Sequence, residues 1–453
     1  MAKRVHLIGI GGIGISALAR YFLSQNWTVS GSDITPSQIL DALKKDGAEI
    51  TIGHKTQNVN SKINLVVYNQ AIPADNPELK AARKLGVPCY SYPEAVGELT
   101  NNYKTIAIAG AHGKSTTTAL TALVLIAGGI DPTVIIGTKL KEFGNTNFRA
   151  GKSKWLVLEA DEWKGSFWHY SPTIAVVTNI DKEHLDFYKT FAGVKQGFQK
   201  FIKNIRPDGA LFINKGYSNV LKNIRVGLRT VILFSKSDRA AAKIKKVLQI
   251  PGEHNVLNGL AAYHIGRHLG IPEKTILKAL ASYQGAWRRL EYRGDLQVKI
   301  ESKKVLKAGV YDDYAHHPTE IRATLAGMRQ KWPKNSIICV FQAHQVQRLK
   351  LLFRDFLGAF KAADKVIILP TYEVAGREVS GRVSSKQKVV SSKADLLGKK
   401  LAKAIGATYV ENPKKELRVT LENLLITNHH LLITIVMMGA GNIVNYTDLV
   451  VRA

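Results

Sequence analysis

The chain has 453 residues, of which 45% are hydrophobic and 22% charged, which excludes a disordered or collagen-like chain and predicts roughly two to four globular domains. Lysine and arginine total 64 against 35 aspartates and glutamates, and the net charge of +29 predicts attraction to anions such as nucleotides, nucleic acid or acidic lipids. Two cysteines, Cys89 and Cys339, are too few for a disulfide framework or a cysteine-rich metal centre. The longest apolar stretches are too short or glycine-broken to cross a bilayer, so we expect a cytoplasmic protein without membrane insertion.

The N-terminal part of the chain alternates apolar strands with helical patterns. Strands are expected over Val5–Ile10, Trp27–Ser30 and Leu65–Tyr68, and an apolar helix pattern follows the first of them. Such an alternation predicts a doubly wound parallel sheet. The polar segment Tyr90–Tyr103 precedes the next strand and marks the first expected domain boundary.

A glycine-rich turn joins the first strand to its helix. The motif G-x-G-x-x-G runs from Gly9 to Gly14, and Asp33 follows the second strand. In this setting the glycines let backbone amides and a helix N-terminus approach a pyrophosphate, which could belong to a dinucleotide or to a UDP-sugar. The alternative is a glycine-mediated contact between strand and helix without a ligand.

A phosphate loop opens the second expected domain. The strand Thr105–Ala109 runs into G-A-H-G-K-S-T-T, which begins at Gly110, and the apolar helix Ala119–Leu125 comes next. In such a loop backbone amides cradle phosphates, Lys114 supplies a fixed positive charge, and a hydroxyl group can reach Mg²⁺. The glycine spacing is shorter than in the full phosphate-loop pattern, but the flanking strand and helix favour ATP binding over a chance match.

Two acidic clusters follow later strands of this domain. E-A-D-E begins at Glu159, and N-I-D-K-E-H ends at His184. Carboxylates at strand ends near a phosphate loop suit Mg²⁺, which prefers oxygen ligands, whereas each cluster alone is more typical of a solvated loop. The strands and helices expected in this domain are Trp155–Glu159, Ile174–Thr178, Ala210–Ile213, Val231–Phe234, Asn255–Leu269 and Glu273–Tyr283.

The C-terminal part repeats the alternation of strands and helices. Its motif D-D-Y-A-H-H-P-T-E begins at Asp312 and directly follows a strand. We interpret the motif as a nucleotide-facing loop rather than a zinc site, since adjacent histidines on a turn rarely point at one ion. The Ser/Lys-rich stretch Ser380–Ser392 is expected to be a mobile loop. The expected strands are Lys307–Tyr311, Ser336–Phe341, Lys365–Leu369 and Leu432–Met437.

Taken in order, these motifs resemble the Mur ligases of peptidoglycan synthesis, from Val5 to Ile443. The blocks G-E-H-N-V-L-N, W-R-R-L-E, F-Q-A-H and M-G-A-G-N-I carry the same resemblance. It implies three α/β domains: a Rossmann-like UDP-binding domain, a central phosphate-loop ATPase domain and a C-terminal Rossmann-like domain, which we place at residues 1–102, 103–293 and 294–453. It also implies an ATP- and Mg²⁺-dependent ligase that forms an acyl phosphate on UDP-N-acetylmuramate and joins the acyl group to L-alanine.

The resemblance also implies roles for individual residues. Catalysis is expected from Lys114, Glu159, His184 and Arg289. Metal binding is expected from Ser115, Glu159 and His184. ATP binding is expected from Gly110, Ala111, His112, Gly113, Lys114, Ser115, Thr116, His254, Asn255, Asn258, Arg289, Asp313 and His316. UDP-sugar binding is expected from Gly11, Gly12, Ile13, Gly14, Asp33, His54, His344 and Arg348.

Three alternatives stay open beside this interpretation. Gln345 stands where the family has an arginine, which leaves the amino-acid substrate open and keeps a related ligase that recycles whole tripeptides. A basic phosphate-loop ATPase acting on nucleic acid is less well supported because no RRM, KH or zinc-finger signature is recognised. Lys114 and Glu159 argue against a nonenzymatic UDP-sugar sensor. We therefore expect UDP-N-acetylmuramate, L-alanine and ATP as partners, no nucleic acid, and a monomer or homodimer.

Overall fold

The computed structural model describes residues 3–222, 230–300, 305–373 and 391–452. Contacts divide the chain into a first unit, Met1–Gln249 with His254–Gln284, and a second unit, Ile250–Glu253 with Gly285–Ala453. Across the described ranges, no helix combines the length and apolar character needed to span a bilayer. The loop expected over Ser380–Ser392 lies mostly outside the described residues, and its last two residues instead begin a helix at Ser391.

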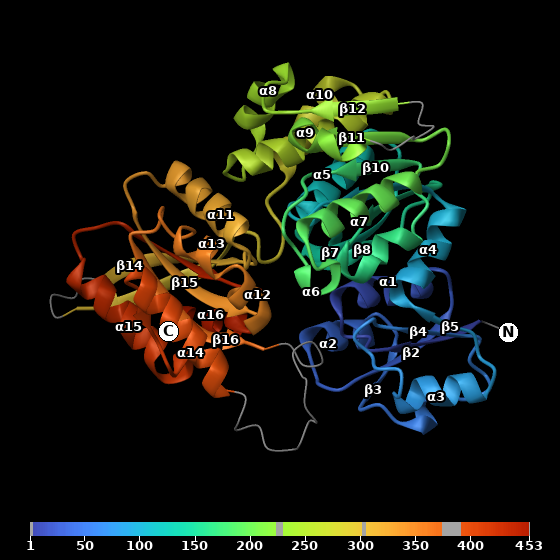
Figure 1. Ribbon diagram of the computed structural model, residues 1–453, viewed down its shortest axis with the longest axis horizontal. Coiled ribbons are helices and arrows are strands. Elements are labelled where there is room, and N and C mark those ends of the chain that lie inside the picture. The colour runs from blue at the N-terminus through green and yellow to red at the C-terminus, as the bar shows by residue number, and fades with distance from the viewer. Residues whose placement is uncertain (1–2, 223–229, 301–304, 374–390, 453) are drawn as a thin grey trace. The chain divides into compact units, whose positions relative to one another are not determined.

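The N-terminal part of the first unit is a parallel α/β sheet (Figure 1). Its elements are β1 (Arg4–Ile8), α1 (Ile13–Ser24), β2 (Thr28–Asp33), α2 (Gln38–Lys45), β3 (Glu49–Ile52), η1 (Thr56–Asn58), β4 (Leu65–Tyr68), α3 (Pro77–Lys84), β5 (Cys89–Ser91) and α4 (Tyr92–Asn102). The strand order is β3-β2-β1-β4-β5. Leu7 of the central strand packs with α1 and Ile8 packs with α3, so both faces are covered and the predicted doubly wound sheet is confirmed. Strands β3 and β5 escaped prediction because these edge strands lack a buried apolar run.

A seven-stranded sheet follows in the same unit. Its strands are β6 (Lys104–Ala109), β7 (Thr133–Leu140), β8 (Thr146–Arg149), β9 (Trp155–Glu159), β10 (Ile174–Val177), β11 (Ala210–Asn214) and β12 (Thr230–Phe234). The helices are α5 (Lys114–Ala127), η2 (Lys141–Phe143), η3 (Trp163–His169), α6 (Leu185–Tyr188), α7 (Phe191–Lys203), η4 (Lys215–Leu221), α8 (Arg239–Val247), α9 (Glu253–His268) and α10 (Glu273–Ser282). The order is β12-β11-β10-β6-β9-β7-β8, and β8 is antiparallel to β7. The hairpin of β7 and β8 was not predicted.

The two sheets of the first unit share one hydrophobic core. The same cluster of buried side chains contains Leu18 of α1, Phe148 of β8 and Leu158 of β9. The ring of Phe148 lies 6.4 Å from that of Tyr21 in α1, at a steep angle that aromatic pairs favour. Burying apolar surface across both sheets stabilises their mutual placement, so the two predicted ligand loops sit on one packed body.

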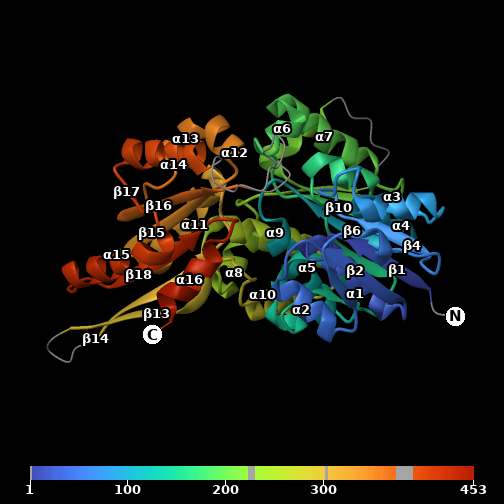
Figure 2. The ribbon, with the colours of Figure 1, turned by 90° about the horizontal axis from the view of Figure 1, so that it is seen from below.

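The second unit contains a six-stranded sheet with helices on both faces (Figures 1 and 2). Its strands are β13 (Glu291–Lys299), β14 (Val305–Asp313), β15 (Ser336–His344), β16 (Lys365–Tyr372), β17 (Thr408–Tyr409) and β18 (Ile433–Met438). Its helices are α11 (Pro318–Lys331), α12 (Val346–Leu351), α13 (Phe353–Leu357), α14 (Ser391–Ile405), α15 (Pro413–Thr427) and α16 (Ile443–Val451). The order is β13-β14-β18-β15-β16-β17, parallel except for the β13–β14 pair. Cys339 faces the core under α11 and α13, and Val340 faces the core under α15, as alternation along a strand requires.

Candidate active site

The glycine turn between β1 and α1 is tied to Asp33 at the end of β2. The amide of Gly11 donates a hydrogen bond to Asp33 Oδ2 (2.9 Å), and the amide of Ile34 donates to Oδ1 (2.8 Å). A Cβ on Gly11 would lie 2.8 Å from that carboxylate, so only glycine fits. The first turn of α1 carries no acidic side chain. The N-terminus of this helix therefore suits an anion such as a diphosphate.

His54, which is expected to bind the UDP-sugar, lies beside the buried carboxylate of Glu78. The sequence analysis did not identify Glu78 as part of the site. The Nδ1 atom of His54 lies 2.9 Å from Ser32 Oγ and 3.3 Å from Glu78 Oε2. The Ser32 hydroxyl donates to Glu78 (2.5 Å), and the Asn58 amide donates to the same carboxylate. Burial raises the pKa of Glu78, but hydrogen bonds from His6, Ser32 and Asn58 outweigh it and lower the pKa to about 2. At neutral pH the Glu78 carboxylate is therefore charged, and hydrogen bonds from the protein take the place of water around it.

The phosphate loop is shaped by two close approaches of side chains to its glycines. Gly110 has φ 144° and Gly113 has φ 80°, values that favour glycine. A Cβ on Gly110 would lie 2.0 Å from Thr178 Oγ1, and one on Gly113 would lie 2.5 Å from Asn258 Oδ1. The loop between β6 and α5 is therefore fixed by β10 on one side and by α9 on the other.

Other predicted nucleotide residues lie around this loop in the first unit. The amide of His112 donates to Asn179 Oδ1 (2.8 Å), which ties the loop to the segment after β10. Thr117 in α5 donates to Asn258 Oδ1 (3.2 Å), and Asn258 Nδ2 donates to Asn255 Oδ1 (3.3 Å). His254 follows the first residue of α9. The structure thus brings the start of α9 beside the phosphate loop, and the contact of His254, Asn255 and Asn258 with ATP stays a prediction.

Lys114, the first residue of α5, is held over the loop by oxygen atoms. Its Nζ donates to the carbonyl of Gly110 (2.7 Å) and to Glu162 Oε2 (2.8 Å), and it lies 3.6 Å from Asp161 Oδ1. Burial lowers the pKa of Lys114, but the negative charges of Glu162 and Asp161 outweigh it and raise the pKa above its ordinary value. Lys114 is therefore a fixed cation where a phosphate would bind.

Two glutamates, the half-buried Glu159 and the buried Glu162, stand beside Lys114 and form candidate metal ligands. Glu159 accepts hydrogen bonds from Ser115 Oγ (3.0 Å) and from the amide of Gly137 (2.8 Å). Glu162 is 1% exposed, and its Oε1 has no hydrogen-bond partner among the residues that the structure describes. This atom lies 3.7 Å from Nε2 of His184. Burial raises the pKa of both glutamates, so each carboxylate would gain from a nearby cation.

The predicted metal ligands fall into two neighbouring groups. Ser115 donates a hydrogen bond to Glu159, whereas His184 lies beside Glu162. The sequence indicates Glu162 only as a member of an acidic cluster. One ligand atom each from Asp161, Glu162 and His184 lies within 4.8 Å of the others. A buried, unpartnered carboxylate oxygen among hard oxygen donors fits Mg²⁺. The only sequence signal for Glu162 was its position three residues after Glu159.

In the second unit, Asp313 anchors the loop that follows β14. Its carboxylate accepts hydrogen bonds from the amides of Leu290 (2.8 Å) and Ala315 (2.9 Å). Burial raises the pKa of Asp313. Arg289 lies with its guanidinium 5.2 Å from the ring centre of Tyr314, a cation–π contact that orients it. Asp313 thus shapes this loop, and its contact with ATP stays a prediction.

Three further predicted residues gather where β14 and β15 end. The rings of His316 and His344 lie 5.6 Å apart, and His344 stacks on Tyr372 at 5.7 Å. Arg348 donates to the carbonyl of His344 (3.3 Å) from the first turns of α12. Within the second unit, residues predicted for ATP and for the UDP-sugar therefore share one edge of the sheet.

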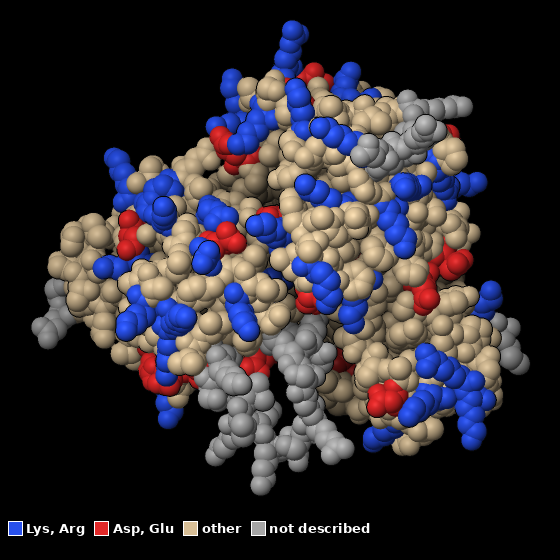
Figure 3. Space-filling view, viewed as in Figure 1, with Lys and Arg blue, Asp and Glu red and all other residues tan. Residues whose placement is uncertain are grey.

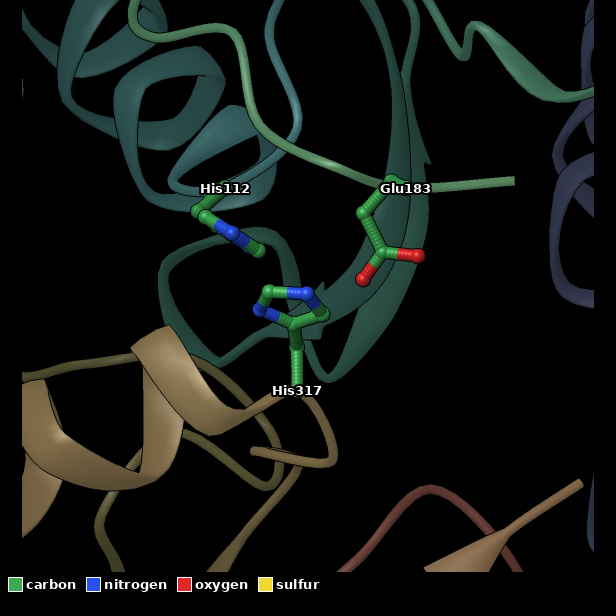
Figure 4. A group of neighbouring side chains, drawn as sticks. All are labelled: His112, Glu183 and His317. Carbon is green, nitrogen blue, oxygen red and sulfur yellow. The ribbon is translucent and has the colours of Figure 1, made fainter. Parts of the chain in front are cut away.

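Adjacent histidines of the second unit serve different partners. His317 is the N-cap of α11 and accepts a hydrogen bond from the amide of Thr319 (3.3 Å), while His316 faces His344. Figure 4 draws His317 with His112 and Glu183, which lie on two loops of the first unit. Because these three side chains belong to different units, they are not assigned to one metal site.

The comparisons with known proteins agree with the expected architecture. Three domain families match in chain order: the Mur ligase family catalytic domain over residues 4–104, the Mur ligase middle domain over 108–266, and the Mur ligase glutamate ligase domain over 297–415. The three-domain α/β fold predicted from the motifs is thereby confirmed.

Curated relatives and solved structures point the same way. The UDP-N-acetylmuramate–L-alanine ligase of Desulfosudis oleivorans is 40% identical over 402 residues, covering 84% of this chain and 86% of the relative. The enzyme of that name from Aquifex aeolicus is 37% identical over 401 residues, with 84% and 86% covered. A solved UDP-N-acetylmuramate–alanine ligase of Thermotoga maritima has a TM-score of 0.76 at 25% identity, with 99% and 98% covered. A solved murein peptide ligase of Psychrobacter arcticus, at 20% identity and a TM-score of 0.69 over the full length of both chains, shares the fold. The chain belongs to the Mur ligase family.

Proposed function

We propose that this ligase joins L-alanine to UDP-N-acetylmuramate at the expense of ATP, in the synthesis of peptidoglycan precursors. The observation that carries the proposal is the phosphate loop, where Lys114 lies between a loop carbonyl and Glu162 while Ser115 meets Glu159. The same packed unit contains the glycine turn with Asp33. The proposal places the enzyme in the cytoplasm, as a monomer or homodimer.

The chemistry needs activation because a carboxylate is a poor electrophile. The γ-phosphoryl group of ATP passes to a carboxylate oxygen of the sugar nucleotide, which gives ADP and an acyl phosphate. The amine of L-alanine then attacks the acyl carbon and forms the new C–N bond. The C–O bond to the phosphate breaks, inorganic phosphate leaves with the electron pair, and the amine nitrogen loses a proton. Lys114 and the loop amides position the phosphates and balance the charge of the transferring group, which is the main demand of phosphoryl transfer.

Mg²⁺ fits the buried carboxylates beside the loop. Glu162 supplies an unpartnered oxygen, with Asp161 and His184 beside it, and Ser115 with Glu159 forms the second group. When bound, the ion would offset the negative charge of the phosphates. The protein's own part is to present these oxygens in a site where burial disfavours uncompensated carboxylates.

Binding of the sugar nucleotide is proposed for the glycine turn and its surroundings. The turn of residues 11–14 faces the diphosphate with the N-terminus of α1, Asp33 and His54 flank it, and the three parts 1–102, 103–293 and 294–453 take the UDP-sugar-binding, ATP-binding and ligase-domain roles. From the second unit, the proposed contributors are Arg289 at the γ-phosphate, Asp313 and His316 at the nucleotide, and His344 and Arg348 at the UDP-sugar.

Amino-acid-dependent phosphate release with UDP-N-acetylmuramate, ATP and Mg²⁺ tests the proposal. L-alanine should support turnover, and omission of either the sugar nucleotide or Mg²⁺ should abolish it. Turnover with the tripeptide L-Ala-γ-D-Glu-diamino acid but not with L-alanine would favour the ligase that recycles tripeptides. This alternative stays open because Gln345 stands where the family has an arginine. Vigorous ATP hydrolysis without the sugar nucleotide would contradict both. On the visible face, lysine and arginine are dispersed rather than gathered in one stripe (Figure 3).

A further inference from the structure

A single amide side chain links the helix of the glycine turn to the seven-stranded sheet. Asn147 lies in β8 and is 1% exposed. Its Nδ2 donates to the carbonyl of Ile13 (2.5 Å) and to Ser16 Oγ (2.9 Å), and its Oδ1 accepts from Arg20 Nη1 (2.6 Å). Both donors and the acceptor of the amide are thus used by one helix, α1.

The residues that receive Asn147 are themselves fixed. Ser16 donates to the carbonyl of Ile13 (2.9 Å), and Arg20 donates to Asp46 at the end of α2 (2.8 Å). Ile13 is the first residue of α1 and comes directly after the glycine turn. A displacement of Asn147 would therefore be transmitted to the backbone that faces the diphosphate.

The other strand of the same hairpin reaches the phosphate loop. In β7, the amide of Gly137 donates to Glu159 Oε2 (2.8 Å), and Glu159 Oε1 accepts from Ser115 (3.0 Å). A Cβ on Gly137 would lie 2.9 Å from the Glu159 carboxylate, so strand and carboxylate are in close contact. The β7–β8 hairpin thus connects to both ligand loops, to α1 through Asn147 and to α5 through Glu159.

We propose that Asn147 is a positioning residue for amide formation, which holds the sugar-nucleotide turn in register with the phosphate loop. The inference rests on the proposed function, because it assigns the two ligands to these two loops. Reacting atoms must approach to about 3–3.5 Å, and a misplacement of about 1 Å can cost on the order of 100-fold in rate. Asn147 is placed to prevent such a misplacement although it touches neither loop's expected ligand.

The test compares Asn147→Ala with the wild type and with Thr146→Val. The Thr146 hydroxyl bonds to the carbonyls of Phe143 (3.0 Å) and Phe148 (2.8 Å), both in the segment that contains the hairpin, so the control loosens the hairpin without touching α1. Asn147→Ala should lower kcat about 10- to 100-fold and weaken UDP-N-acetylmuramate binding in calorimetry, with the Kd for ATP within about twofold of wild type. Thr146→Val should leave all three values within about twofold.

A second variant keeps the inference testable if Asn147→Ala does not fold. Asn147→Asp retains the acceptor for Arg20 but turns an oxygen toward the Ile13 carbonyl, so it should show the same kinetic pattern. A lowered melting temperature with unchanged kcat and unchanged binding would overturn the inference, as would equal losses in Thr146→Val. Failure of the wild-type protein to bind UDP-N-acetylmuramate would instead overturn the proposed function.

Discussion

Replacing Lys114 with methionine should lower the turnover rate by about two to three orders of magnitude and also destabilise the fold, and the two effects can be separated. The Lys114 side chain is 13% exposed and its partner Glu162 is 1% exposed, with 2.8 Å between Nζ and Oε2. Removing one member of a buried ion pair leaves an uncompensated charge and costs about 3–5 kcal/mol. Because Lys114 retains some exposure, we expect about 3 kcal/mol. Loss of the cation at the phosphates should add about 3–4 kcal/mol to the barrier, on the order of 10²- to 10³-fold in rate.

The double variant Lys114→Met with Glu162→Gln isolates the structural part. Removing both charges should restore the free energy of unfolding to within about 1 kcal/mol of wild type, since the Glu162 carboxylate is no longer buried as a charge without its partner. Phosphate release should stay about 10²- to 10³-fold slower than in wild type. Denaturant unfolding measures the first quantity and the coupled assay the second, while calorimetry should show UDP-N-acetylmuramate binding unchanged because the glycine turn lies on another sheet. Turnover in the double variant near the wild-type rate would refute the role of Lys114, and persistent instability would refute its pairing with Glu162.

Three further outcomes follow from the buried groups and the loop geometry. The pKa of Glu78 falls from 4.5 to about 2 on folding, so the ionised carboxylate stabilises the fold above pH 4.5. This contribution of about 3 kcal/mol should be lost as the pH falls toward 2. The Glu78→Gln variant should not show this loss in acid-unfolding curves. Burial raises the pKa of Asp312 from 3.8 to about 6, so protonated Asp312 stabilises the fold below pH 3.8. About 3 kcal/mol of the free energy of unfolding should be lost as the pH rises through 6. The Asp312→Asn variant should lack this pH dependence. Gly113→Ala should weaken ATP binding at least tenfold by titration, because its Cβ would lie 2.5 Å from Asn258, whereas Gly129→Ala, at φ 77° with open space, should cost only about 1 kcal/mol of stability and leave binding unchanged.

Much of the fold and of the loop chemistry could be predicted because it is encoded locally. The central strands are short apolar runs buried on both faces, and the glycines sit where a strand turns into a helix. Edge strands are different: β3 is mostly exposed, and β8 of the unpredicted hairpin is only four residues long. Their sequences carry no uninterrupted apolar signal, so periodicity could not find them.

The hydrogen bonds that hold the site residues in place could not be predicted, because each of them joins residues that are far apart in the sequence. Asn147 lies 131 residues from Ser16, and Glu78 lies 46 residues from Ser32. An asparagine in a strand or a glutamate at a helix start has no local mark of such a partner. Gln345 could be noticed as a departure from the family motif, and its φ of 72° shows that the backbone there is in the left-handed region.

Three glutamates of the first unit, Glu78, Glu159 and Glu162, show how hydrogen-bond donors distinguish a structural carboxylate from one that could bind a cation. Glu78 receives hydrogen bonds from Ser32, Asn58 and a backbone amide, and these hold its pKa far below the ordinary value despite burial. Glu162 is almost fully buried and Glu159 is half-buried, and for both of them the cost of burial outweighs the favourable contacts and raises the pKa. The difference lies in what surrounds the oxygens: the charge of Glu78 is satisfied within the protein, whereas Glu162 keeps an oxygen without a hydrogen bond beside the phosphate loop. A cation arriving there with the nucleotide would add to the positive charge that Lys114 supplies, so the cost of burying these carboxylates would be offset further when the proposed substrate complex forms.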